Sequence, residues 1–247
     1  MMKIGKQFKS LIMVGALLTL PLSALANVPE KKVIDYVAMG DSLAAGITPD
    51  GDDGLGYPDY IKQRFEQSQY TINFNNDSAK GGYTTIDLMK DMENESLRDA
   101  IKEAELITID IGANDVLPVL NAFLVQRATP EDIDRAIENT TANIGEILNE
   151  IEGINPNAKV YVMGYYNPMP HILPGHQPLI EQLLETLNGA IEQVTDINGD
   201  TFVPTAKVIA KDPDTYLPNP EDIHLSEEGY QQIAKEFWKK IDKSKSN

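Results

Sequence analysis

Four short segments of this 247-residue chain carry residues that could do chemistry together. Ser42 lies in GDSL at 40–43, and His224 ends EDIH at 221–224. A serine hydroxyl becomes a nucleophile when an imidazole accepts its proton and a carboxylate orients that imidazole. Two further segments, NDSAKGG at 76–82 and GAND at 112–115, offer glycine N–H groups and an asparagine amide that could stabilise an oxyanion. Together these residues meet the requirements of acyl transfer.

The elements that must position these residues alternate between strand and helix patterns. Runs rich in Val, Ile and Tyr predict strands at 33–39, 71–76, 106–111, 159–166 and 201–206. Amphipathic patterns with capping residues predict helices at 57–67, 84–95, 96–105, 129–153, 178–194 and 226–243. This alternation predicts an α/β fold with a parallel sheet of about five strands, covered by helices on both faces.

The chemistry-bearing segments follow the ends of the predicted strands. In a parallel sheet, ligands bind beyond the carboxyl ends of the strands, so we expect the first three segments to share one rim with 221–224. Asp41 interrupts an otherwise apolar run immediately before Ser42. We expect its carboxylate to bond the backbone and shape this corner, not to serve as the catalytic acid.

With these motifs in this order, the sequence resembles the SGNH/GDSL hydrolases, a family of esterases and lipases with a flavodoxin-like, three-layer α/β/α fold. The resemblance runs through most of the chain after residue 26 and implies that Ser42 is the nucleophile. It also implies that Asn114 and the N–H groups of Ser42 and Gly81 form the oxyanion hole, with Gly82 as the alternative to Gly81. Such a mechanism requires no metal and no organic cofactor.

The segment that contains His224 departs from the family pattern. The family usually shows an aspartate three residues before the histidine, but here that position is Glu221, and Asp222 lies two before His224. Glutamate at the family spacing keeps a carboxylate on the side that can reach the imidazole, so we favour Glu221 as the acid. Asp222 is the alternative, and it would require a different local backbone.

Other catalytic and ligand-binding patterns fit less well. The chain contains no G-x-S-x-G nucleophile elbow, and the Lys-Ser/Thr pair that a glycine-rich phosphate-binding loop requires does not follow Gly46. His171 and His176 lie in a Pro-rich segment that reads as a loop over the active-site edge, not as a zinc site. The acidic segments 50–54 and 196–200 lack the spacing of a calcium-binding EF-hand, so we interpret them as polar turns.

Residues 1–26 have the pattern of a signal peptide, and 27–247 form the predicted hydrolase domain. Three lysines precede an apolar segment that ends in Ala-Leu-Ala, so the mature protein is expected to begin at Asn27 and to be secreted as a monomer. An uncleaved membrane anchor is the alternative. The chain lacks cysteine, and without the leader lysines 18 Lys+Arg face 38 Asp+Glu, a net charge of −20. This charge disfavours nucleic acid and anionic membrane surfaces as partners.

The acyl group and the alcohol are less constrained by the sequence. Apolar residues at 117–126 and 169–173 either line a site for acyl chains or pack on the core. We expect a secreted serine esterase or lipase that acts on a small-molecule or lipid ester. The alternatives are a cell-wall carbohydrate deacetylase on the same scaffold and a surface-binding protein without enzymatic activity.

Overall fold

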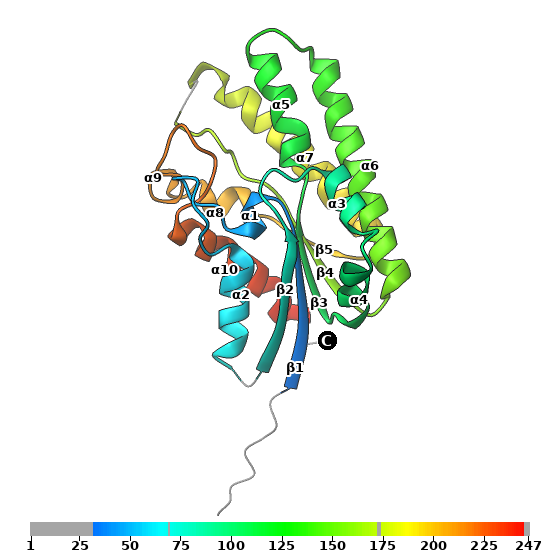
Figure 1. The fold of residues 1–247 in the computed structure, drawn as a ribbon. Helices are drawn as coiled ribbons and strands as arrows, with labels where there is room; N and C mark the ends of the chain where they lie inside the picture. Colours follow the sequence, from blue (N-terminus) through cyan, green and yellow to red (C-terminus); the bar gives the residue numbers. More distant parts are fainter. Residues whose placement is uncertain (1–31, 69, 172–173, 245–247) are drawn as a thin grey trace, which may run out of the picture. The chain divides into compact units, whose positions relative to one another are not determined.

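A computed structural model of the protein describes residues 32–68, 70–171 and 174–244 (Figure 1). The predicted signal peptide at 1–26 lies outside these residues. Five parallel strands form one sheet in the described part of the chain, in the order β2-β1-β3-β4-β5. The strands are β1 (Lys32–Gly40), β2 (Tyr70–Ala79), β3 (Leu106–Asp110), β4 (Lys159–Met163) and β5 (Thr201–Val203).

Helices cover both faces of this sheet, as the sequence predicts. On one face lie α2 (Tyr57–Glu66) and α10 (Glu227–Ser244), with the short helices α1 (Ser42–Ala45), α8 (Ala206–Ile209) and α9 (Pro213–Tyr216) on the same side (Figure 1). On the other lie α3 (Thr85–Asp91), α4 (Glu95–Glu103), α5 (Ala113–Leu124), α6 (Pro130–Ile154) and α7 (Gln177–Ile197). The expected three-layer α/β/α sandwich is therefore confirmed.

Burial along the strands agrees with two covered faces. All five residues of β3 are buried, and so are the last residues of β1. Such strands read as continuous apolar runs because neither face meets water. Within the described segments, no helix is both long enough and apolar enough to cross a bilayer.

The element bounds differ from the predictions at several ends. Strands β4 and β5 stop at Met163 and Val203, three residues earlier than expected, while β2 extends to Ala79. Helix α6 continues through Gly153 to Ile154, where Asn155 ends it. The sequence analysis did not predict α5, because Pro118 interrupts its pattern. This helix matters for function because it carries Asn114.

The carboxyl ends of β1 and β3 approach each other closely. Gly40 has a φ of 149°, and a Cβ at that position would lie 2.2 Å from the carbonyl oxygen of Asp110. Only glycine fits there. Directly after it, the N–H of Asp41 donates to the same Asp110 carbonyl at 3.0 Å. The corner that leads to Ser42 is thus fixed against the neighbouring strand.

Candidate active site

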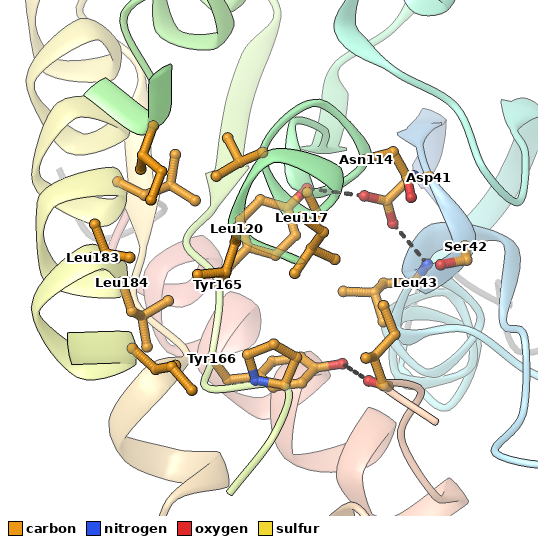
Figure 2. A pocket seen from close by; sticks show the side chains of 17 residues that line it. Asp41, Ser42, Leu43, Asn114, Leu117, Leu120, Tyr165, Tyr166, Leu183 and Leu184 are labelled. Atoms are coloured by element: carbon orange, nitrogen blue, oxygen red, sulfur yellow. Dashed lines mark hydrogen bonds between the residues drawn. The ribbon is translucent and has the colours of Figure 1, made fainter. Parts of the chain in front are cut away.

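Ser42 is the first residue of α1, at the carboxyl end of the central strand β1. Asp41 is the N-cap of this helix, and its Oδ1 accepts a hydrogen bond from the N–H of Leu43 at 3.0 Å. The expected backbone-bonding role of Asp41 is therefore confirmed. The side chain of Ser42 lies on the wall of an apolar pocket (Figure 2). Its own N–H has no hydrogen-bond acceptor among the described residues, so this donor is available to a ligand.

His224 lies in the loop before α10 and is held by Asp222. The Nδ1 atom of the ring is 2.7 Å from Oδ1 of Asp222, and the backbone N–H of His224 donates to the same oxygen at 2.7 Å. An aspartate readily folds back onto the N–H two residues further along the chain. This turn is the different local backbone that the shorter spacing requires. It directs the ring so that Nε2 is left to accept a proton.

Glu221, which the family spacing favours, lies elsewhere. Its backbone N–H donates to Oδ1 of Asn219 at 3.0 Å, and the residue is exposed. Within the part of the chain that the structure covers, its carboxylate makes no hydrogen bond or ion pair with His224. The contact with the imidazole is made by the alternative residue, Asp222.

The loop of His224 adjoins the corner that carries Ser42. Ile223 lines the same pocket as Ser42, and its carbonyl accepts a hydrogen bond from the Tyr166 hydroxyl at 2.8 Å. A positive charge on His224 also lowers the pKa of Asp41, which burial otherwise raises. The imidazole is therefore within electrostatic range of the residue next to Ser42.

Asn114 is the second residue of α5 and also lines this pocket. Its Nδ2 donates to the carbonyl of Tyr83 at 2.8 Å. An amide nitrogen has two protons, so this bond orients the group and leaves one proton for a ligand. Gly112, just before the helix, has a φ of 123° and packs closely on Thr140 of α6.

The two candidate glycines, Gly81 and Gly82, have different backbone requirements. They occupy a turn closed by the N–H of Tyr83, which donates to the carbonyl of Lys80 at 3.2 Å. Gly82 has a φ of 81°, so the turn itself requires glycine there. A Cβ on Gly81 would meet only Ile47, at 3.6 Å. The N–H of Gly81 has no acceptor in the described segments, which leaves it available to a ligand.

Asp115 connects the Asn114 segment to the Gly81 segment. Its carboxylate accepts hydrogen bonds from the N–H of Thr85 at 3.0 Å and from the Thr85 hydroxyl at 2.6 Å. Burial raises the pKa of Asp115, and the bonds from Thr85 oppose that effect. Because Thr85 begins α3, this contact fixes the turn before α3 against the start of α5.

Two buried carboxyl groups lie beneath the Ser42 corner. Asp41 is 1% exposed and Asp110, the last residue of β3, is 0% exposed. Burial, together with the adjacent Asp41 carboxylate, raises the pKa of Asp110 well above its ordinary value. The sequence analysis missed Asp110, although an acid inside the apolar run LITIDI at 106–111 is a signal that could have indicated it.

An apolar pocket begins at Ser42 and Asn114 and extends between α5 and α7 (Figure 2). Apart from Asp41, Ser42, Asn114, Tyr165 and Tyr166, its lining is aliphatic and comprises Leu43, Ala113, Val116, Leu117, Leu120, Ile133, Pro168, Ile180, Leu183, Leu184, Leu187 and Ile223. Of the two apolar segments noted in the sequence, 117–126 contributes Leu117 and Leu120. Residues 172 and 173 of the second segment lie outside the described part of the chain.

The sequence analysis places His171 and His176 in a loop and not in a zinc site. His171 lies 3.5 Å from Asp214 and 3.4 Å from the carbonyl of Pro213. In the described ranges, no group of three or more His, Asp or Glu side chains is arranged to hold a metal ion. The acidic segment 50–54 begins in a turn closed by the Gly51 N–H, which donates to the carbonyl of Thr48 at 2.9 Å, and Asp53 pairs with Ile47 in an isolated β-bridge.

Comparison with known proteins agrees with this architecture. Residues 38–232 match the model of the GDSL-like Lipase/Acylhydrolase family. The chain is 26% identical over 225 residues to the uncharacterized protein YpmR of Bacillus subtilis, covering 86% of this chain and 83% of that protein. The solved lipase Lip_vut3 from a goat rumen metagenome is 22% identical with a TM-score of 0.70, over 83% of this chain and 95% of the other.

A second solved structure extends the likeness to another kind of esterase. Axe2, an acetylxylan esterase from Geobacillus stearothermophilus, is 18% identical with a TM-score of 0.65 and covers 86% of this chain and 96% of its own. The family model spans every segment singled out above, from the GDSL corner to the histidine. The chain therefore belongs to the GDSL-like lipase/acylhydrolase family, whose members are carboxylic ester hydrolases.

Proposed function

We propose that this protein hydrolyses carboxylic esters through an acyl-enzyme formed on Ser42, with His224 as the base and Asp222 as the acid that orients it. The observation that carries the proposal is the 2.7 Å contact between Asp222 and Nδ1 of His224. It fixes the tautomer in which Nε2 is unprotonated and able to accept the serine proton. Glu221 has no part in this mechanism.

The reaction then follows the chemistry of an activated serine. His224 accepts the Ser42 proton as the hydroxyl attacks the ester carbonyl, and Asp222 stabilises the imidazolium. The oxyanion is bound by the N–H groups of Ser42 and Gly81 and by the second amide proton of Asn114. The alcohol departs with the proton from His224. Water, activated by the same imidazole, then releases the acid and restores Ser42.

The pocket supports an ester with an apolar acyl chain. A chain attached to Ser42 would enter a space lined almost entirely by aliphatic side chains from α5 and α7. Each methylene moved from water into such a space contributes about 0.8 kcal/mol, so activity should rise with acyl length until the pocket is full. An acetyl group would leave this surface unused.

A series of nitrophenyl esters from acetyl to palmitoyl tests the proposal directly. We expect the highest kcat/KM at an intermediate chain length, no turnover by Ser42→Ala, and labelling of Ser42 by a fluorophosphonate. Leu120→Phe should shift the preference to shorter chains, while Val125→Phe, an exposed position just after the same helix, should not. Release of acetate from acetylated polysaccharide without cleavage of longer esters would instead favour the carbohydrate deacetylase. Absence of both hydrolysis and labelling would favour a non-enzymatic binding protein.

We also propose that the protein is exported and acts as a monomer on a small or lipid ester outside the cytoplasm. The basic start, the apolar segment and the Ala-Leu-Ala site at 24–26 support export. Sequencing the N-terminus of protein recovered from culture medium should give Asn27 as the first residue. Recovery of the intact chain only from membranes would favour the uncleaved anchor.

A further inference from the structure

The two buried carboxyl groups beneath Ser42 lie next to each other. The carboxylates of Asp41 and Asp110 accept hydrogen bonds from two successive N–H groups, those of Leu43 and Ala44, and both residues are buried. Two adjacent carboxylates in a buried space cannot both be charged unless a cation compensates them. In the described part of the chain, neither residue forms an ion pair with a lysine or arginine. A second negative charge in this buried space would be uncompensated, so the pair holds one proton and one charge.

The surroundings indicate that the proton resides on Asp110. Asp110 is completely buried and accepts hydrogen bonds from the Tyr57 hydroxyl at 2.7 Å and from the Ala44 N–H at 3.1 Å. Asp41 accepts the same two kinds of bond, from the Tyr165 hydroxyl at 2.9 Å and from the Leu43 N–H, and it also lies within electrostatic range of His224. The nearby imidazole therefore favours the charge on Asp41 and the proton on Asp110.

The pair determines which backbone donor of α1 remains free. The N–H of Leu43 donates to Asp41 Oδ1, and the N–H of Ala44 donates to Asp110 Oδ2 at 3.1 Å. The N–H of Ala45 donates to the carbonyl of Asp41 at 3.1 Å. In the first turn of this helix only the N–H of Ser42 is left without an acceptor among the described residues. This is the donor that an oxyanion on Ser42 would use.

We propose that Asp110 is a positioning residue of the esterase: by sharing one proton with Asp41 and binding the Ala44 N–H, it fixes the start of α1 so that, of the N–H groups of this helix, the one of Ser42 is presented to the oxyanion. The inference rests on the proposed function and deepens it. Loss of the shared proton would put a second charge beneath the nucleophile and disturb this corner.

Few other titratable groups face the pair. They are Tyr36, Tyr57, Tyr165, Tyr166, Tyr230 and His224. Burial raises the pKa of each of these tyrosines, so they stay neutral through the alkaline range of an activity assay. An alkaline decline in turnover that depends on residue 110 therefore reports on the carboxyl pair.

Two substitutions at Asp110 test whether the residue acts through its hydrogen bonds or only by filling space in the core. In Asp110→Asn, the amide oxygen still accepts from the Ala44 N–H, and the amide nitrogen replaces the oxygen that accepts from the Tyr57 hydroxyl, which must then turn to act as the acceptor. We expect kcat to fall only about two- to fivefold near neutral pH, whereas Asp110→Ala lowers kcat at least about fiftyfold with a nearly unchanged KM. Because burial raises the pKa of Asp110, the wild type should lose kcat as the pH rises and the pair gives up its proton, and Asp110→Asn should lack that decline. Asp99→Asn, an exposed acid on α4, is the matched control.

The inference is overturned if Asp110→Asn shows the same alkaline decline as the wild type, or if it loses as much kcat as Asp110→Ala. The stability of variants that lack the Ser42 hydroxyl tests the carboxyl pair independently of the proposed esterase activity. The free energies of unfolding in urea of Ser42→Ala and of Ser42→Ala/Asp110→Asn should diverge with rising pH. Only in the first protein does unfolding release the proton of Asp110, so only its stability falls as the pH rises. That divergence without esterase activity in the wild type would refute the proposed function alone. Parallel stability curves would refute the carboxyl pair, whatever the activity.

Discussion

The side-chain amide of Asn114 donates a hydrogen bond to the carbonyl oxygen of Tyr83, with a nitrogen–oxygen distance of 2.8 Å. This bond joins the start of α5 to the turn that carries Gly81 and Gly82, although the segments are far apart in the sequence. One residue further on, Asp115 binds Thr85 at the start of α3. Two adjacent residues of α5 thus set the position of one proposed oxyanion donor, Asn114, relative to another, Gly81.

Replacement of Asn114 should affect the transition state far more than substrate binding. Asn114→Ala removes the amide proton assigned to the oxyanion, so we expect kcat to fall about 10²- to 10³-fold with little change in KM. Steady-state kinetics with the preferred nitrophenyl ester measures this. Asn121→Ala, an exposed position on the same helix, provides the control. A loss confined to KM would contradict the assigned role.

Asp115 should be needed for stability as well as for activity. In the wild type, the N–H and the hydroxyl of Thr85 each donate to an oxygen of Asp115. In Asp115→Asn, the amide nitrogen replaces one of these oxygens, so one Thr85 donor loses its acceptor, which lowers the free energy of unfolding by about 1–3 kcal/mol. We also expect a lower kcat, because the contact between Asp115 and Thr85 holds the start of α5, and with it the amide of Asn114, in position. Urea unfolding and kinetics of the same preparation check both effects. If Asp115→Asn were as stable as the wild type, the contact with Thr85 would not fix α3.

Substitutions of the two neighbouring acids identify the residue that serves His224. Asp222→Asn keeps the shape of the side chain but removes its charge, so we expect kcat to fall about 10³- to 10⁴-fold. Glu221→Gln is the matched control and should remain within about twofold of the wild type, because that side chain is exposed. The reverse result would assign the acid to Glu221, as the family spacing favours.

The choice between these acids shows where sequence reasoning reaches its limit. The alternation of strands and helices, which follows from hydrophobic periodicity, predicts the sheet and its coverage. Because residues after parallel strands share one rim, it also predicts that Ser42 and Asn114 line one pocket. The Asp222 contact depends on one local turn, in which the aspartate accepts the N–H of His224. No periodic pattern encodes such a turn.

The buried carboxyl pair was missed for a related reason. Asp110 ends an apolar strand, but its partners come from distant segments, with Tyr57 on α2 and Asp41 after β1. A single acid in an apolar run indicates burial, while its hydrogen-bond partners depend on how the strands are ordered in the sheet. Helix α5 was missed because Pro118 reads as a helix breaker, although the helix continues through it from Ala113 to Leu124.

The two glycines of the turn at 80–83 should respond differently to alanine. Gly82→Ala places a side chain at a φ of 81°, which we expect to cost about 1–2 kcal/mol of unfolding free energy. Gly81→Ala adds a methyl group whose only neighbour is Ile47 at 3.6 Å, so its stability should stay close to that of the wild type. Thermal unfolding of both variants measures the difference. Equal destabilisation would mean that the turn requires glycine at both positions.

Asp200, just before β5, should make stability depend on pH. Burial, with a smaller contribution from Glu152, raises the pKa of its carboxyl group to about 6. The unfolded chain releases this proton near its ordinary pKa of about 4, whereas the folded protein retains it up to about pH 6. Through that window the stability of the wild type falls as pH rises, because ionised Asp200 is disfavoured only in the folded state.

Asp200→Asn removes this penalty. We expect the variant to have a higher Tm than the wild type at neutral pH, and the difference should vanish below about pH 4, where both states of the wild type are protonated. Glu152→Gln should give a smaller gain at neutral pH, since it removes only the neighbouring charge. A difference in Tm that is the same at acidic and neutral pH would contradict this account, because it would show that the substitution acts through packing and not through the ionisation of Asp200.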